Sequence, residues 1–161
     1  MGKVKIAKTN AARLLDRAAI PYELIPYEVD ENDLAASHVA ASLGEDIACV
    51  FKTLVLTSGP GHFFVCVVPG NCEVNLKKAA AAAGVKKIEM IPMKELLGVT
   101  GYIRGGCSPL GMKKPFPTFF HKTATQLPFI YVSAGMRGLQ LKVDPAQLIK
   151  FVGAEVADLT D

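Results

Sequence analysis

The sequence predicts an α+β fold in which helices flank a mixed, largely antiparallel β-sheet. Segments typical of strands and of helices are interspersed along the 161 residues instead of alternating strictly, which favours antiparallel pairing. Hydrophobic residues make up 50% of the chain, so one sizeable core can form without metals or disulfides. We therefore expect a single domain that covers residues 1–161.

Two helices and an edge strand are predicted in the N-terminal part of the chain. The first helix covers residues 9–19, where apolar side chains recur on one side, and Pro21 follows its end. Residues 22–27 form a short strand, and Pro26 places it at a sheet edge because proline cannot donate to a strand ladder. The second helix covers residues 34–43.

A β-hairpin and a third helix are predicted in the middle of the chain. Residues 47–57 and 62–68 are typical of strands, and they are joined by the turn Ser58-Gly59-Pro60-Gly61. Asn75 is a suitable cap for a helix over residues 76–83, because its side chain can accept from a backbone N–H of the first turn.

The remaining elements surround a loop that is rich in glycine. We expect this loop, residues 98–111, to carry function, because glycine permits unusual backbone angles and the close approach of a ligand. The chain also contains a brief strand, a short helix, three further strands and a final helix. Their predicted ranges are 88–91, 92–97, 118–121, 129–133, 138–143 and 145–152.

The net charge is only +3, but the charges are unevenly distributed. Residues 22–46 contain seven acidic residues and no lysine or arginine. Residues 74–131 contain nine basic residues against two acidic ones. The basic part can meet a phosphate backbone, although two ordinary solvated faces explain the pattern equally well.

The four cysteines are interpreted as buried, reduced thiols, and no metal site is predicted. They are Cys49, Cys66, Cys72 and Cys107, and they lack the short paired spacing of a zinc site. Residues 1–8 are basic but lead into no apolar segment of a signal peptide. No stretch approaches the roughly 20 apolar residues of a membrane span. We therefore expect a cytoplasmic protein.

Lys52 is the most informative residue, because it interrupts the apolar face of a predicted strand. Side chains alternate along a strand, so every second residue shares a face. The other members of this face are Ala48, Val50, Leu54 and Leu56. Since burying an unpaired charge is costly, the side chain either reaches out to water or faces a cleft. In a cleft it can bind a carbonyl oxygen or a phosphate, or act as a base.

Two further segments can contribute to such a cleft. The N–H groups of residues 101–111 can receive an oxyanion or a ribose hydroxyl, but a wide connecting loop is the simpler interpretation. This loop is no nucleophile elbow, because Leu110 stands where G-x-S-x-G requires glycine. Near the end of another strand, Ser133 can donate a hydrogen bond into a cleft. Arg137 can bind a phosphate or a carboxylate, or belong to a structural ion pair.

The histidines are not assigned a role. His38, His62 and His121 are scattered, and no Ser-His-Asp grouping is visible in the sequence. A serine hydrolase that uses Ser108 or Ser133 is therefore poorly supported.

Three segments, in the same order, resemble the YbaK/EbsC proteins. They are Phe51-Lys52-Thr53-Leu54, Gly105-Gly106-Cys107-Ser108-Pro109 and Ser133-Ala134-Gly135-Met136-Arg137-Gly138-Leu139. Those proteins are stand-alone relatives of the editing insertion domain in bacterial prolyl-tRNA synthetases. The resemblance implies a partly closed mixed sheet flanked by helices. It also implies hydrolysis of the ester between tRNA and a mischarged amino acid, with Cys-tRNA(Pro) as the expected substrate.

The resemblance further implies which residues form the site. Carried over by motif position, the catalytic residues are Lys52, Gly105 and Ser133. The substrate-binding residues are Tyr22, Gly106, Cys107, Ser108, Pro109, Arg137 and Gln140. Tyr22 corresponds to an aromatic residue at the pocket entrance, and some family members carry an acid at the position of Gln140. The implied partner is the acceptor end of mischarged tRNA, and a prolyl-tRNA synthetase is a further candidate. No cofactor, DNA or membrane is implied.

The expected chemistry requires no protein nucleophile. Loop N–H groups near residues 105–108 orient the ester and stabilise the oxyanion, while Lys52 fixes a phosphate or sugar or polarises the carbonyl. Ser133 positions the aminoacyl group, and the attacker is water or the substrate's own thiol. Two alternatives stay open: editing of another small amino acid such as alanine or serine, and a non-catalytic module that binds tRNA or a synthetase.

Overall fold

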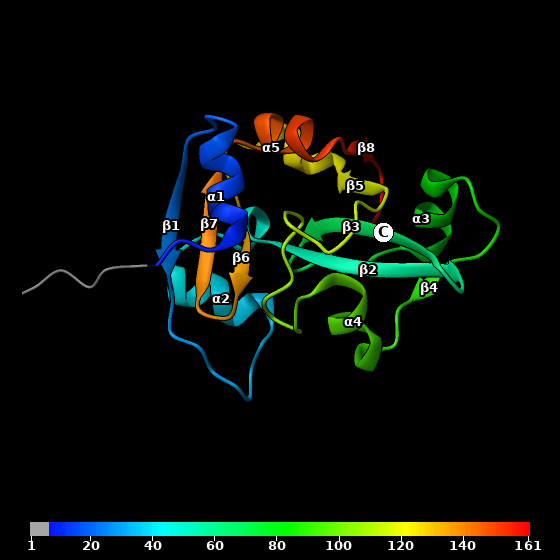
Figure 1. Ribbon diagram of the computed structural model, residues 1–161, viewed down its shortest axis with the longest axis horizontal. Helices are drawn as coiled ribbons and strands as arrows, with labels where there is room; N and C mark the ends of the chain where they lie inside the picture. The colour runs from blue at the N-terminus through cyan, green and yellow to red at the C-terminus, as the bar shows by residue number, and fades with distance from the viewer. Residues whose placement is uncertain (1–6) are drawn as a thin grey trace, which may run out of the picture.

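The strands of the computed structural model form two open sheets (Figure 1). Residues 7–161 are described, so most of the basic N-terminal stretch lies outside the described residues. The smaller sheet has the order β1–β7–β6, and both of its pairs are antiparallel. Its strands are β1 (Tyr22–Pro26), β6 (Ile130–Met136) and β7 (Leu139–Val143). The position of β1 confirms the predicted edge strand.

The larger sheet has the order β4–β2–β3–β5–β8. Pairing is antiparallel among β4, β2 and β3, and parallel among β3, β5 and β8, which confirms the predicted mixed, largely antiparallel fold class. Its strands are β2 (Phe51–Gly59), β3 (His62–Pro69), β4 (Glu89–Met90), β5 (Thr118–His121) and β8 (Glu155–Ala157). The expected partial closure extends only to one parallel bridge, Val50–Tyr131, which joins the two sheets.

Helices flank both sheets, and α3 begins at the cap that the sequence predicts. The α-helices of the described chain are α1 (Asn10–Arg17), α2 (Ala36–Leu43), α3 (Leu76–Ala83), α4 (Leu96–Thr100) and α5 (Pro145–Val152). In Figure 1, α1 and α2 lie by the smaller sheet, α3 lies by the far end of β2, and α4 lies below β2. Asn75 caps α3 as predicted, because its side chain accepts from the backbone N–H of Lys78. No helix within residues 7–161 is long and apolar enough to cross a membrane.

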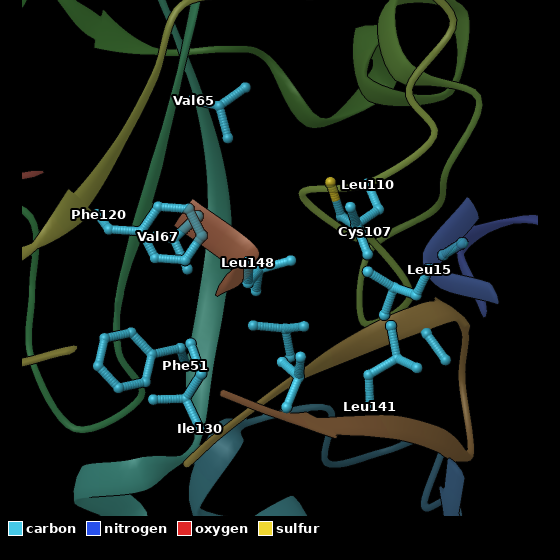
Figure 2. Close-up of a cluster of buried hydrophobic side chains, with 14 of the residues drawn as sticks. Leu15, Phe51, Val65, Val67, Cys107, Leu110, Phe120, Ile130, Leu141 and Leu148 are labelled. Carbon is cyan, nitrogen blue, oxygen red and sulfur yellow. The ribbon is translucent and has the colours of Figure 1, made fainter. Parts of the chain in front are cut away.

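The main core lies between the two sheets, whose strands run across one another in Figure 1. Figure 2 shows side chains from both sheets and from two helices meeting in it. The contributors with almost no exposed surface include Leu15, Val67, Phe120, Ile130, Leu141 and Leu148. Burying one such side chain contributes roughly 1.5–3 kcal/mol, so this interface holds the two sheets in a fixed relation.

Three predicted boundaries are wrong at points that matter for the site, and the first is the start of α2, at Ala36 instead of residue 34. The strand predicted at 47–57 begins only at Phe51, because the Asp46 side chain caps a 3₁₀ helix, Ile47–Cys49. Ala48 therefore does not share the strand face of Lys52. The helix predicted at 92–97 is a 3₁₀ turn, Met93–Glu95, followed by α4, so it takes three residues from the predicted loop.

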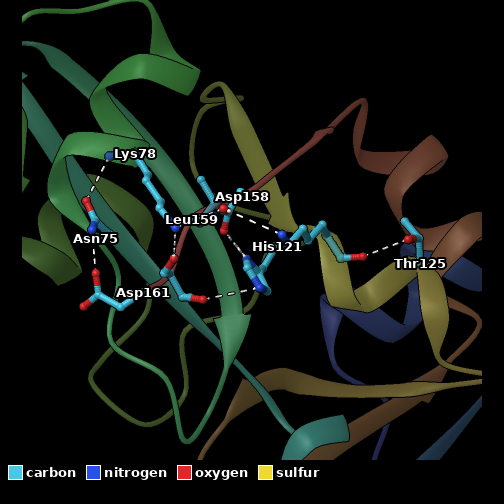
Figure 3. A network of polar contacts seen from close by, with 9 residues as sticks. Asn75, Lys78, His121, Thr125, Asp158, Leu159 and Asp161 are labelled. Carbon is cyan, nitrogen blue, oxygen red and sulfur yellow. Dashed lines mark hydrogen bonds and ion pairs between the residues drawn. The ribbon is translucent and has the colours of Figure 1, made fainter.

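The C-terminal segment is held by a network of polar contacts that the sequence does not predict (Figure 3). Lys78 donates to Asp158 Oδ2 at 2.9 Å and to the Thr160 carbonyl at 2.6 Å. The Leu159 N–H donates to Nδ1 of the buried His121 at 3.1 Å. We call this set the C-terminal clamp; its members are Asn75, Lys78, His121, Asp158, Leu159 and Thr160.

Candidate active site

A cleft of about 480 Å³ opens between α2, the first half of β2, the α4 segment and the glycine-rich loop. Residues of β6 and β7 complete its lining. Its charged lining residues in the described chain are Lys52, Glu73 and Arg104, and its polar ones include Thr53, Ser133 and Gln140. The remaining wall is largely apolar. The expectation that Lys52 faces a cleft beside the glycine-rich loop therefore agrees with its position.

Lys52 lines the cleft from β2, two residues after Val50, which precedes the strand, and two residues before Leu54. These two neighbours pack into two separate apolar clusters, and Lys52 lies between them along the strand. Its side chain is 26% exposed, and its Nζ lies 3.8 Å from Oε1 of Glu73, which is 92% exposed. An ion pair with such an exposed carboxylate contributes little, so an anionic ligand can displace Glu73.

The start of α2 adds unpaired backbone donors to the same cleft. Leu34, Ala35 and Ala36 line it; the Ala35 N–H donates to Asp33 Oδ1 at 3.3 Å, whereas the side chain of Ala35, the N-cap residue, caps no amide of the first turn. Amides in the first turn of a helix lack intrahelical partners and favour negative charge. The close approach of α2 depends on Gly70, because a Cβ there would lie 2.3 Å from the Ala36 Cβ. The α2 start and Lys52 together make this end of the cleft suited to an anion.

Ser133 and Gln140 face each other as a register pair of β6 and β7. The register of this hairpin shifts between Ser133 and Met136, and the Ser133 hydroxyl accepts from the N–H of Gly135 at 3.1 Å. Gly135 has φ +107°, and a Cβ there would lie 3.1 Å from the Tyr102 ring. Gln140 is only 5% exposed, and its Oε1 makes no hydrogen bond with the described protein atoms. The cleft thus contains an acceptor that only water or a ligand can satisfy.

Thr53 is a cleft residue that sequence reasoning missed. Its Oγ1 is buried and also makes no hydrogen bond within residues 7–161. The Ile91 N–H donates to the Val55 carbonyl, so backbone groups two residues earlier, at Thr53, point toward the same edge of β2. That edge is open here, because β4 pairs only with Leu56 and Thr57. Strand alternation places the side chains of Thr53 and Lys52 on opposite faces of β2. Both residues nevertheless line the cleft, which lies at the open edge of the strand.

The glycine-rich loop lines the cleft with only some of its expected residues. Gly105 and Cys107 line it, whereas Gly106 does not. Gly105 has φ +83°, and a Cβ there would meet the Arg137 side chain at 3.4 Å. The Gly106 N–H already donates to the Ile103 carbonyl at 2.9 Å, so it is not available to an oxyanion.

Three other expected binding residues lie behind the cleft wall. Ser108 is fully buried, and its hydroxyl accepts from the Leu110 N–H, which argues against a nucleophile there. Pro109 is buried beside it. Arg137 donates to the Arg104 carbonyl and to Glu31 Oε2, both at 2.8 Å. These three residues and Gly106 thus do not line the cleft, and their expected contact with substrate stays a prediction. Arg137 ties the loop, at the Arg104 carbonyl, to the β6–β7 hairpin.

Tyr22 does not line the cleft, and its expected role at the pocket entrance stays a prediction. Its hydroxyl donates to Asp16 Oδ1 at 2.9 Å, and its ring lines a separate depression with Ile20 and Leu24. The reason is its place in the sheet: Tyr22 begins β1 opposite Val143, at the edge away from β2.

The cysteines are free thiols, but they are not equally buried. Cys49, Cys66 and Cys107 are buried, as expected, while Cys72 is only partly so. Burial raises the pKa of Cys107 to about 12, so this cleft residue is a neutral thiol at physiological pH. A thiolate is required for nucleophilic attack, which argues against Cys107 as a nucleophile. Within residues 7–161, no group of three or more histidine, cysteine or acidic residues is placed to hold a metal ion.

Comparison with known proteins gives three findings. A family model described as "Aminoacyl-tRNA editing domain" matches residues 30–151. A protein of Enterococcus faecalis, described as a candidate Cys-tRNA(Pro)/Cys-tRNA(Cys) deacylase, EbsC, is 44% identical over 95% of this chain and 93% of its own. A proline–tRNA ligase of Trichlorobacter lovleyi is 36% identical over 48% of this chain, which corresponds to 13% of the ligase.

The structural comparison agrees on the fold. A crystal structure described as a candidate trans-editing enzyme for prolyl-tRNA synthetase superposes with a TM-score of 0.80 at 22% identity, covering 96% of this chain and 99% of the other. At this identity the likeness concerns the fold alone. The family model and the identity to EbsC reach further, because each spans most of the sequence, including the residues that line the cleft. The chain belongs to the aminoacyl-tRNA editing domain family.

Proposed function

We propose that this chain is a trans-editing deacylase that hydrolyses the ester of mischarged tRNA, with Cys-tRNA(Pro) as its main substrate. The observation that carries the proposal is the position of Lys52, a cation in a largely apolar cleft opposite Gly105 and Cys107 of the glycine-rich loop. The name of the E. faecalis relative supports the same substrate class. Function in translation agrees with a cytoplasmic protein, which we also propose.

The part of the cleft that contains Lys52 and the start of α2 binds the anionic part of the substrate. Lys52 and the unpaired amides at the start of α2 hold the terminal phosphate or the ribose, and Arg104 adds a second positive charge. Glu73 leaves Lys52 when the substrate arrives, because its carboxylate is almost fully solvated. This arrangement places the ester between Lys52 and the loop.

The loop and the β6–β7 hairpin orient the aminoacyl group. N–H groups at Gly105 and Cys107 receive the carbonyl oxygen as its negative charge develops. Ser133 donates its hydroxyl hydrogen to the aminoacyl group, and the unpartnered oxygens of Thr53 and Gln140 accept from its amine. Gln140 therefore serves where some relatives use an acid, but as a neutral acceptor.

The attacking atom comes from water or from the substrate itself. In the second route the cysteine sulfur bonds to the ester carbon, the bond from that carbon to the ribose oxygen breaks, and the thiol proton passes to the ribose oxygen. The products are a cyclic thioester and free tRNA. A pocket distinguishes ligands that differ by one methylene by only about 1–3 kcal/mol of binding free energy. A thiol attacker adds selectivity, because alanine and proline have no thiol.

A side-by-side turnover assay tests the proposal. Ester loss is measured with tRNA(Pro) carrying cysteine, alanine, serine or proline, at equal enzyme and tRNA concentrations. We expect Cys-tRNA(Pro) to be deacylated fastest and Pro-tRNA(Pro) to be spared. Faster loss of alanine or serine would reassign the substrate. Binding of all four without ester loss would identify a non-catalytic module instead.

We further propose that residues 1–161 act as a single editing domain that relies on a prolyl-tRNA synthetase for tRNA selection. The relation to a segment of a proline–tRNA ligase supports this partner. The acidic stretch 22–46 is a suitable docking surface, since it carries seven acids and no base. Neutralising Glu28, Asp30 and Asp33 should weaken co-purification with the synthetase; unchanged binding would contradict this part of the proposal.

A further inference from the structure

Exposed apolar side chains gather at one rim of the cleft. Met90 and Met93 line the cleft and are 41% and 56% exposed. Leu97 is 54% exposed in the same segment, on α4. Monomeric proteins seldom leave neighbouring large apolar side chains in water unless a ligand or partner covers them.

The local structure explains why these side chains face outward. The 3₁₀ turn that starts at Met93 runs directly into α4, so Met93 and Leu97 are four residues apart on one helical face. Leu96 lies on the opposite side, where it is buried and anchors the segment to the core. In Figure 1 this segment lies beside β2 and β4. We call Met90, Met93 and Leu97 the apolar rim.

Basic residues outnumber acidic ones in the segment that carries the apolar rim. Lys94 adjoins Met93, and Lys113 lies along α4, since its Nζ donates to the Gly98 carbonyl at 3.3 Å. Arg104 lines the cleft itself. Residues 89–114 contain four basic and two acidic residues, Glu89 and Glu95, so the rim retains a positive excess. An apolar strip flanked by cations complements a ligand with flat apolar faces and regularly spaced anions.

We propose that the apolar rim binds the unpaired 3′ nucleotides of tRNA, which precede the aminoacyl ester in the cleft. This inference rests on the proposed function. The nucleobases lie against Met93 and Leu97, where thioether and aliphatic groups meet aromatic rings favourably. The phosphates between them face Lys94, Lys113 and Arg104. The positive excess favours a nucleic acid over an apolar protein surface as the occupant.

Binding of uncharged RNA tests the rim without requiring catalysis. The probes are two acceptor-stem hairpins of tRNA(Pro) sequence, one with its unpaired 3′ nucleotides and one blunt-ended. For the wild-type chain we expect the overhang to strengthen binding about tenfold. The double variant Met93→Ser, Leu97→Ser should bind both hairpins about equally. The matched controls are Phe151→Ser and Val156→Ser, which remove exposed apolar side chains from α5 and β8.

The outcomes separate this inference from the proposed function. Loss of the overhang effect in the double variant, with both controls unchanged and all variants folded, supports the rim. An overhang effect that is absent in the wild type, or that survives in the double variant, overturns it. Deacylation of Cys-tRNA(Pro) is measured separately. A protein that shows the overhang effect through the rim but does not deacylate would contradict the proposed function and leave this inference in place.

Discussion

The cleft and the C-terminal clamp both contain buried polar groups, but only the clamp pairs all of them with other protein groups. In the clamp, His121 accepts from a backbone N–H, and Lys78 donates to two oxygens. In the cleft, the Thr53 hydroxyl and the Gln140 carbonyl oxygen find no protein partner among residues 7–161. Lys52 meets only a solvated carboxylate at 3.8 Å.

This difference separates stability from function. A satisfied network contributes to the folded state, whereas an unsatisfied buried acceptor costs roughly 1–3 kcal/mol. In the cleft a ligand can supply the missing partner, whereas the buried Thr123 hydroxyl, which is also unpartnered within residues 7–161, lies outside it. Substitutions in the clamp should therefore lower stability and spare activity, whereas substitutions of Lys52 or of the unpartnered polar groups in the cleft should lower activity without lowering stability.

The largest effect is expected for Lys52→Ala. Removing the cation from the cleft should lower kcat/KM for Cys-tRNA(Pro) by at least about 100-fold, because it removes an oriented charge from the reacting ester. The melting temperature should stay the same, since the lost ion pair involves an exposed carboxylate. Steady-state deacylation and thermal melts measure both, with Lys77→Ala on α3 as the control. A folded variant with full activity would remove Lys52 from the mechanism.

The converse result is expected for Lys78→Ala in the clamp. This variant loses the contacts to Asp158 and to the Thr160 carbonyl, so the free energy of unfolding should fall by about 1 kcal/mol. Deacylation at a temperature well below the melting transition should not change. Urea titration compares the variant with Lys77→Ala, its neighbour on α3, which takes no part in the hydrogen bonds of the clamp. If both variants had the same free energy of unfolding, the Lys78 contacts would make no contribution to stability.

Thr53→Val should move stability and activity in opposite directions. Valine has the shape of threonine without the unpartnered hydroxyl, so the free energy of unfolding should rise by about 1 kcal/mol. Activity should fall about three- to tenfold if the hydroxyl accepts from the substrate. The control is Thr57→Val on the same strand, whose hydroxyl donates to the Gly59 carbonyl at 2.7 Å. That variant should lose stability and keep its activity.

These residues also show which parts of the molecule were predictable from sequence. The helix at 76–83 was predicted to the residue, because its Asn75 cap and Gly84 end act locally. The Lys52 cleft was also expected, since a charge on an apolar strand face requires an exit. The place of Thr53 in the cleft was not expected, because it depends on where β4 stops pairing with β2.

The remaining differences arise from tertiary packing. Nothing local in Tyr22 reveals that β1 lies at the edge away from the cleft. The role of Arg137 depends on Arg104 and Glu31, which lie far from it in sequence. β8 is three residues long and pairs only with β5, so its strand pattern is too short to recognise.

The pH dependence of stability should report on His121. Burial is the main cause that lowers its pKa below 6.5, with Lys122 and Lys78 adding to the effect and Asp158 opposing it. The unfolded chain then binds a proton more readily than the folded chain, so stability falls as the pH drops through 6.5 toward the lower folded value. His121→Gln keeps an acceptor for the Leu159 N–H and should flatten this decline in pH-dependent melts. The exposed His62→Gln should leave the decline as it is.

The smallest effect on activity is expected for Cys107→Ala, although its thiol is in the cleft and is the obvious nucleophile by position. Burial raises the pKa of this thiol to about 12, so it stays neutral across the working range and kcat/KM should change by less than about twofold. Figure 2 shows the sulfur beside Leu110 in the main core, so the variant should lose about 1 kcal/mol of stability. A pH–rate profile between pH 6 and 9 should superpose on that of the wild type. An inactive but folded variant would mean that the thiol takes part in the chemistry, and the cleft would then depend on a protein nucleophile as well as on orientation.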